Sequence, residues 1–94
     1  MLFITEYEVR PDITREDQKR LMELFGKRGN APGEVAHYAR LDGGGGYIVS
    51  NSTDDDVPAL YERILEFSEF MQFSITPIMR IDDAVGPILK VLAD

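Results

Sequence analysis

The chain has 94 residues, of which 17 are acidic and 10 are basic, so its formal net charge at pH 7 is −7. Because nucleic-acid binding needs clustered basic side chains that neutralise phosphates, this charge argues against a nucleic-acid partner. The absence of cysteine excludes disulfides, thiolate catalysis and zinc–thiolate sites. With 44% hydrophobic and 29% charged residues, the composition predicts a single folded domain over residues 1–94.

No apolar run approaches the roughly 18 residues that a membrane-spanning helix needs. The first residues, MLFITEYE, also lack the basic start of a signal peptide. We therefore expect a soluble, cytoplasmic protein without a membrane partner.

The first third of the chain predicts a strand followed by a helix. Residues 2–9 are dense in β-branched and aromatic side chains and end at a proline-containing turn, which is typical of a strand. Thr14 and Asp17 resemble a capping box, with aspartate in place of the usual glutamate. Apolar residues then recur at helical spacing, so we expect a helix over residues 15–25.

Four consecutive glycines, residues 43–46, separate two apolar runs at residues 34–42 and 47–53. A phosphate-binding loop needs a helix directly after its glycines, but here a strand follows. We therefore interpret the glycines as the turn of a β-hairpin, in which they supply positive φ angles. Gly26 or Gly29 is expected to end the preceding helix in a left-handed conformation.

The last part of the chain predicts a helix, a strand and a short final helix. Three aspartates, residues 54–56, precede a valine and a proline, and proline is favoured in a first helical turn. We interpret the aspartates as a helix cap and not as a metal site, because Ca²⁺ and Mg²⁺ need spaced oxygen ligands. Residues 73–79 predict a fourth strand, in which Pro77 indicates an edge position or a bulge. The final helix opens at Asp82, with Pro87 in or near its first turn.

The resulting order, β-α-β-β-α-β-α, predicts an α+β protein of ferredoxin-like fold with a four-stranded antiparallel sheet and a C-terminal helix. Alternation along the strands assigns one face to the core and both main helices. That face is expected to collect Phe3, Thr5, Tyr7, Val9, Val35, His37, Ala39, Leu41, Tyr47, Val49, Asn51, Phe73, Ile75, Pro77 and Met79.

The opposite face is half apolar. It is expected to collect Leu2, Ile4, Glu6, Glu8, Ala36, Tyr38, Arg40, Ile48, Ser50, Ser52, Ser74, Thr76 and Ile78. Because monomers rarely expose an apolar patch of this size, we expect a second copy to bury the face. Two sheets would then close a barrel with a partly polar interior.

Glu6, Tyr38 and Arg40 are the candidate site residues of that interior. Such a pocket could bind a small carboxylate or phenolic molecule, with Arg40 as an anion clamp and Glu6 or Tyr38 as proton carrier. The alternative is that Glu6 and Arg40 form a buried ion pair that fixes strand register or the dimer.

His37 is the only histidine, and its ordinary pKa near neutrality would suit a general base. The alternation places it on the helix-facing side, where a structural hydrogen bond is the simpler role. A shift of strand register by one residue would reverse that placement. A single histidine does not make a multi-histidine metal site, so no metal is expected.

Several segments, in order along nearly the whole chain, carry a family resemblance. They are MLFITEY at 1–7, APGEVAHY at 31–38, the turn from Asp42 to Gly46, TDD at 53–55, Tyr61-Glu62, FSITPI at 73–78 and IDDAV at 81–85. The chain thereby resembles the family called domain of unknown function 3303. The resemblance implies a dimeric α/β barrel, the architecture of antibiotic-biosynthesis monooxygenases and muconolactone isomerases, and it implies no activity.

Two classes of function stay open. One is a small-molecule enzyme or binder that uses the barrel cavity, and the other is a dimeric structural or interaction module whose barrel is filled by side chains. No flavin, nucleotide or metal motif is present in the sequence, so we expect any chemistry to proceed without a bound cofactor.

Overall fold

The computed structural model describes residues 1–93. Its elements are β1 (Leu2–Val9), α1 (Arg15–Arg28), β2 (Glu34–Ala39), β3 (Gly45–Asn51), the 3₁₀ turn η1 (Asp54–Asp56), α2 (Val57–Phe67), β4 (Met71–Ile78) and α3 (Ile81–Leu92). The predicted element order is confirmed.

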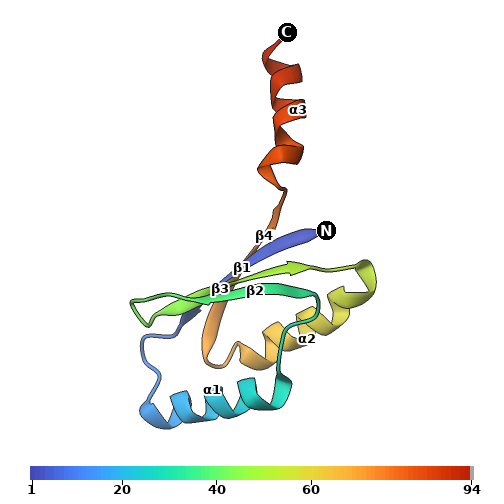
Figure 1. Cartoon of the computed structure of the whole chain (residues 1–94). Helices are drawn as coiled ribbons and strands as arrows, with labels where there is room; N and C mark the ends of the chain where they lie inside the picture. Colours follow the sequence, from blue (N-terminus) through green and yellow to red (C-terminus); the bar gives the residue numbers. More distant parts are fainter. Residues whose placement is uncertain (94) are drawn as a thin grey trace.

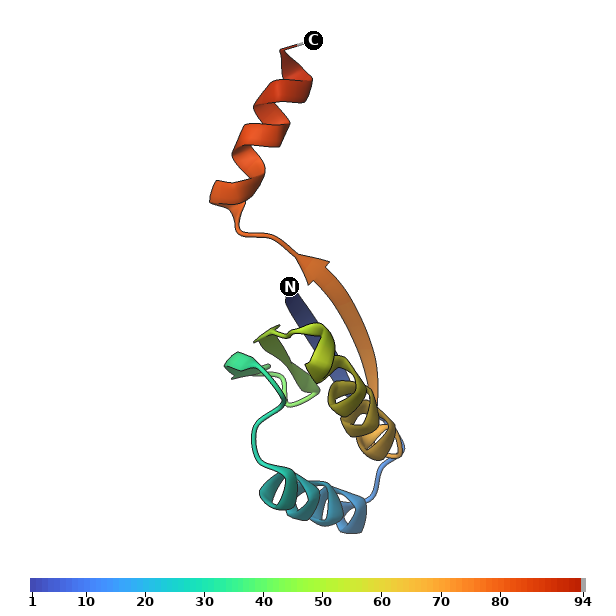
Figure 2. The same cartoon turned by 90° about the vertical axis from the view of Figure 1, so that its right-hand side faces the viewer.

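The four strands form one sheet in the order β2-β3-β1-β4, and every neighbouring pair is antiparallel. Helices α1 and α2 lie on the same side of this sheet, while the other face carries neither of them (Figures 1 and 2). The arrangement is consistent with the ferredoxin-like fold. Pro77 lies in β4, which is an edge strand, as predicted. Because no further strand pairs with the outer side of β4, a proline there need not break a hydrogen bond between strands.

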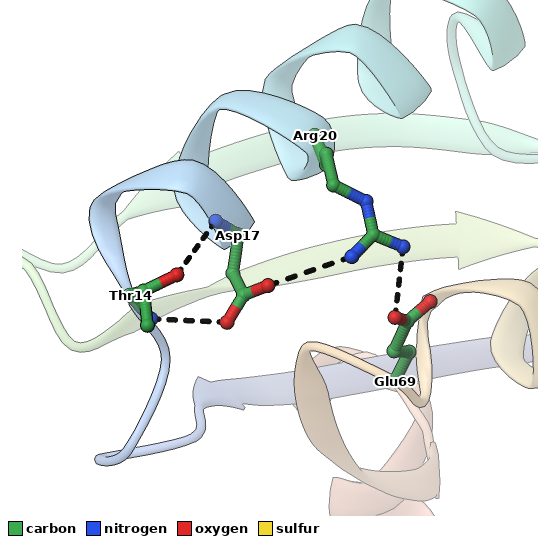
Figure 3. A network of polar contacts seen from close by, with 4 residues as sticks. All are labelled: Thr14, Asp17, Arg20 and Glu69. Carbon is green, nitrogen blue, oxygen red and sulfur yellow. Dashed lines mark hydrogen bonds and ion pairs between the residues drawn. The ribbon is translucent and has the colours of Figure 1, made fainter.

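Helix α1 begins with a capping box, as the sequence predicts. The Asp17 N–H donates to Thr14 Oγ1 at 3.1 Å, and the Thr14 N–H donates to Asp17 Oδ2 at 3.0 Å (Figure 3). The Thr14 hydrogen bonds hold the pKa of Asp17 below its ordinary value. At the other end Gly29, with φ of 67°, ends the helix and donates its N–H to the Phe25 carbonyl, so the second of the two candidate glycines is the cap.

The core lies between the sheet and the two helices. Its buried hydrophobic members are Tyr7, Leu21, Ala31, Ile48, Phe67, Phe70 and Met71. The Phe25 ring of α1 packs on the Phe67 ring of α2 with centroids 4.8 Å apart, which joins the helices above the sheet.

The predicted faces of β3 are wrong by one residue. Thr5 pairs with Ile48 and Glu6 with Tyr47, so Ile48 and Ser50 face the helices while Tyr47 and Val49 lie on the open face. The helix-facing side of β3 needs little bulk at Gly46, because a Cβ there would collide with the hydroxyl of Tyr7 and the carbonyl of Tyr38.

Helix α3 projects away from the sheet beyond the end of β4 (Figures 1 and 2). Pro87 lies inside this helix and not near its first turn, because the helix already begins at Ile81. The missing proline N–H leaves the Asp83 carbonyl without its helical partner, and exposure lets water satisfy it. Within residues 1–93, no helix is both long enough and apolar enough to cross a membrane.

Candidate functional site

A polar and aromatic row crosses the open face of the sheet. In the strand register Tyr38 lies opposite Tyr47, Tyr47 opposite Glu6, and Glu6 opposite Ser74. Directly opposed residues on one face have Cβ atoms about 4.5–5.5 Å apart, so the four side chains are neighbours. Tyr38 is 62% exposed, and Glu6 and Tyr47 are half-buried. We call these four residues the open-face row.

An apolar row lies beside it, one step along the strands. Ala36 pairs with Val49, Val49 with Ile4, and Ile4 with Thr76. The open face therefore offers one carboxylate and two phenols beside aliphatic side chains. A small pocket on such a surface can hold the ring of an organic molecule and one polar group.

Arg40 lies at the hairpin end of the face and does not contact Glu6. Its guanidinium donates to Glu8 Oε1 at 2.9 Å and to Asp42 Oδ2 at 2.6 Å. These hydrogen bonds, the one to Asp42 foremost, raise the pKa of Arg40. The Gly44 N–H, at 2.8 Å, and then Arg40 lower the pKa of Asp42. The alternative, an ion pair between Arg40 and Glu6, is absent among the described residues, and the Arg40 guanidinium is already hydrogen-bonded to two other carboxylates.

His37 lies on the helix-facing side, as alternation along β2 indicates. Its Nε2 is hydrogen-bonded to the Tyr7 hydroxyl at 2.6 Å, and its Nδ1 lies 3.9 Å from Glu34 Oε1. Burial first, and then the charge of Glu34, raises the pKa of Tyr7. Tyr7 is therefore protonated at neutral pH, and one hydrogen bond joins its hydroxyl to the His37 ring. The sheet separates this cluster from Glu6 and Tyr38.

The sequence prediction places Tyr47 and Ser50 on the wrong faces of the sheet and gives Tyr7 no functional role. Tyr47 was assigned to the wrong face, although it flanks Glu6. Ser50 is 1% exposed, and within residues 1–93 its Oγ finds no hydrogen-bond partner. It faces the helices beside Thr5 and Tyr7. Gly46 is the sequence signal for this arrangement. The Tyr7 side chain of β1 lies against Gly46 of β3, where a larger residue would not fit.

Of the three aspartates before α2, Asp56 makes capping hydrogen bonds, and it makes them to Thr53 at the start of η1. As the N-cap residue of α2 itself, Asp56 makes no side-chain capping hydrogen bond. Asp56 Oδ2 accepts from the Thr53 N–H at 2.9 Å and from the Thr53 hydroxyl at 3.0 Å. This leads the chain from η1 into α2. Over residues 1–93, no three acidic or histidine side chains gather in a group that could hold a metal ion.

An antiparallel four-stranded sheet, covered by helices on one face only, places the chain among the α+β proteins whose architecture is consistent with the ferredoxin-like fold. The family model described as Domain of unknown function (DUF3303) matches residues 1–92. The chain belongs to this family, as its sequence segments indicate. No curated protein matches the chain.

Proposed function

We propose that two copies of this chain pack through their open sheet faces into an α/β barrel, and that the space between the sheets binds or converts a small phenolic molecule without a bound cofactor. The observation that carries the proposal is the open-face row itself, in which a carboxylate lies between tyrosines and a hydroxyl on a face that neither α1 nor α2 covers.

The surface area of the chain supports a second copy. Its accessible surface is 6936 Å², whereas a compact protein of this mass exposes about 5,500 Å². The excess exceeds the roughly 800 Å² that one partner contributes to a standard interface. An isologous dimer through the open faces would bury part of this excess, because the same apolar row then meets itself.

The charges on the face favour a phenol over a carboxylate as the ligand. Arg40 is already engaged by Glu8 and Asp42, so it offers little to a further anion. Glu6 carries a negative charge near the middle of the row, and the whole chain carries −7. A neutral phenol can donate its hydroxyl to Glu6 and stack its ring on Tyr38 or Tyr47, whereas a carboxylate would be repelled.

In a catalytic version of this function Glu6 is the proton acceptor for the bound molecule. Tyr38, the more exposed tyrosine, is placed to return a proton. The competing function is a structural module with a filled barrel. The aliphatic row of Ile4 and Val49 favours that outcome, because two such rows could fill the space themselves.

The test measures mass and binding in one series. Sedimentation equilibrium of the full chain should give a dimer. Titration with 4-nitrophenol at a pH below its own pKa, where it is neutral, followed by its absorbance and by calorimetry, should show binding that 4-nitrobenzoate does not match. Glu6→Gln should weaken 4-nitrophenol binding at least tenfold. Glu16→Gln, which removes the same charge from the exposed surface of α1, should leave it unchanged.

The variant Arg40→Met tests whether the ligand is a phenol, which does not need Arg40, or a carboxylate, which would. We expect it to leave 4-nitrophenol binding within twofold, because Arg40 does not reach Glu6. A dimer that binds neither compound would establish the filled structural module. A monomer at high concentration would end the barrel proposal altogether.

A further inference from the structure

Helix α3 has a broad apolar surface that its own chain leaves exposed. None of its side chains is buried. Its large apolar side chains are between 42% and 76% exposed, and they are Ile81, Val85, Ile88, Leu89, Val91 and Leu92. At 100° per residue, Ile81, Val85, Ile88 and Leu92 fall on one narrow stripe, and Lys90 lies opposite. A 12-residue helix with such a stripe is marginal in water unless something covers it.

The helix lies far from the body of the molecule. Both views show α3 continuing past the end of β4, clear of α1 and α2 (Figures 1 and 2). The radius of gyration is 16.2 Å, whereas a compact chain of this length has about 12 Å. Only Met79 and Arg80 connect β4 to α3, and two residues span at most about 7 Å. The start of α3 is thus held near the end of the sheet.

The apolar surface of α3 is continuous with the open face. At the end of the sheet from which α3 leaves, Ile78 pairs with Leu2 and Leu2 with Asn51. Met79 and Ile81 carry exposed apolar side chains from this row onto the helix. Whatever covers the open face therefore also meets the first turn of α3.

We propose that α3 packs on a second copy of this chain, where it closes one end of the space between the two sheets. The inference rests on the dimer of the proposed function and adds a partner element to its site. In a two-fold dimer each helix would cover the partner near its row of Asn51, Leu2 and Ile78. In each subunit, the end of the cavity far from the β2–β3 hairpin would then be lined by side chains from the partner chain.

A second copy fits the charges of α3 better than a lipid surface does. The helix carries Asp82 and Asp83 in its first turn and a single lysine, Lys90, near its end. Helices that bind anionic membranes carry lysine and arginine along their polar face. The apolar stripe of α3 therefore matches an apolar protein surface.

The first test compares two variants that each add one lysine to α3. Ile88→Lys places the charge in the apolar stripe. Gly86→Lys places it on the polar side, where a Cβ meets no atom within 4 Å outside the adjoining residues and the backbone of α3. In sedimentation equilibrium, we expect Ile88→Lys to raise the dimer dissociation constant at least tenfold and Gly86→Lys to change it less than twofold. The Ile88 side chain is not part of the core, so far-ultraviolet circular dichroism should show an unchanged body.

A second test measures whether the dimer protects a thiol on α3 from chemical modification, so it does not require that the dimer be destabilised. Because the chain has no cysteine, Ile88→Cys and Gly86→Cys each introduce a unique thiol. Above the dimer dissociation constant, a maleimide should modify the I88C variant at least tenfold more slowly than the G86C variant. Dilution below that constant should remove the difference.

The outcomes separate this inference from the dimer on which it rests. A dimer whose stability and labelling are the same for both positions would overturn the role of α3 and leave the sheet-to-sheet dimer intact. A monomeric full chain would overturn both. Ile88-dependent binding to vesicles of phosphatidylcholine and phosphatidylglycerol, with an unchanged dimer, would assign α3 to membranes and also overturn the inference.

Discussion

A methyl group at Gly46 would collide with the Tyr7 hydroxyl and with the Tyr38 carbonyl. Neither can move freely, because Tyr7 is hydrogen-bonded to His37 and Tyr38 is paired in the sheet. We predict that Gly46→Ala lowers the free energy of unfolding by about 1–3 kcal/mol, as overpacking usually does.

Gly26→Ala is the matched control for this substitution. Gly26 lies within α1, where an added Cβ meets nothing within 4 Å, so alanine should stabilise the chain by about 0.5–1 kcal/mol. Urea denaturation followed by circular dichroism compares the two. Equal stabilities would show that the crowding around Gly46 does not constrain the fold.

Tyr7 should make stability fall at alkaline pH. Burial raises its pKa above the ordinary value of 10.0, so the folded chain keeps the phenolic proton longer than the unfolded chain does. This contribution to stability is complete below about pH 10 and is lost as pH rises through the pKa of the folded state. Tyr7→Phe should flatten the decline above pH 10. Tyr47→Phe, on the open face, should retain it, and the same slope in both variants would refute the assignment.

At the scale of elements, the order of strands and helices could be predicted because each signal is local. The capping box at Thr14 and the proline-led start of α2 both depend on residues within one turn. The phase of β3 is not evident from this strand alone, because its first two residues, Gly45 and Gly46, have no side chains to show which way the strand faces. Strand register is fixed by the partner strand, which one segment alone does not reveal.

The candidate site was only partly predictable for the same reason. Glu6 and Tyr38 alternate within β1 and β2, so their place on the open face followed from each strand alone. Tyr47 depended on the phase of β3 and was misassigned. The contacts of Arg40 depended on the turn, where Asp42 and Glu8 both come within reach.

The start of α1 is tied to the rest of the fold through one arginine. Arg20 reaches Asp17 of the capping box at 3.5 Å and Glu69, just before β4, at 2.8 Å (Figure 3). It also lies over the Phe70 ring, 5.3 Å from the ring centroid. The cap therefore supports both the helix and its packing on the loop before β4.

We predict that Thr14→Ala lowers the free energy of unfolding by about 1 kcal/mol, since it removes the acceptor for the Asp17 N–H. Asp17→Asn should also destabilise, and its effect should depend on pH. Because the pKa of Asp17 is lowered in the folded chain, its contribution is present above the ordinary value of 3.8 and is lost as pH falls below it. Thermal melts between neutral pH and pH 3 measure this. An Asp17→Asn effect that stays constant with pH would exclude the linkage.

At the scale of the whole molecule, the uncovered face and the projecting helix both point to stability that depends on a second copy. If folding and dimerisation are coupled, the melting temperature must rise with protein concentration. A tenfold increase contributes about 1.4 kcal/mol per dimer. For two chains of this length, that free energy corresponds to a rise of about 3–6 °C.

Calorimetric melts over a hundredfold range of concentration measure the rise. Val49→Lys, in the apolar row of the open face, should abolish the concentration dependence and lower the melting temperature. Val57→Lys makes the same change at the exposed start of α2 and should keep the dependence. A melting temperature that is the same at every concentration for the unaltered chain would mean that the chain is stable alone. The open face would then need an occupant other than a second copy.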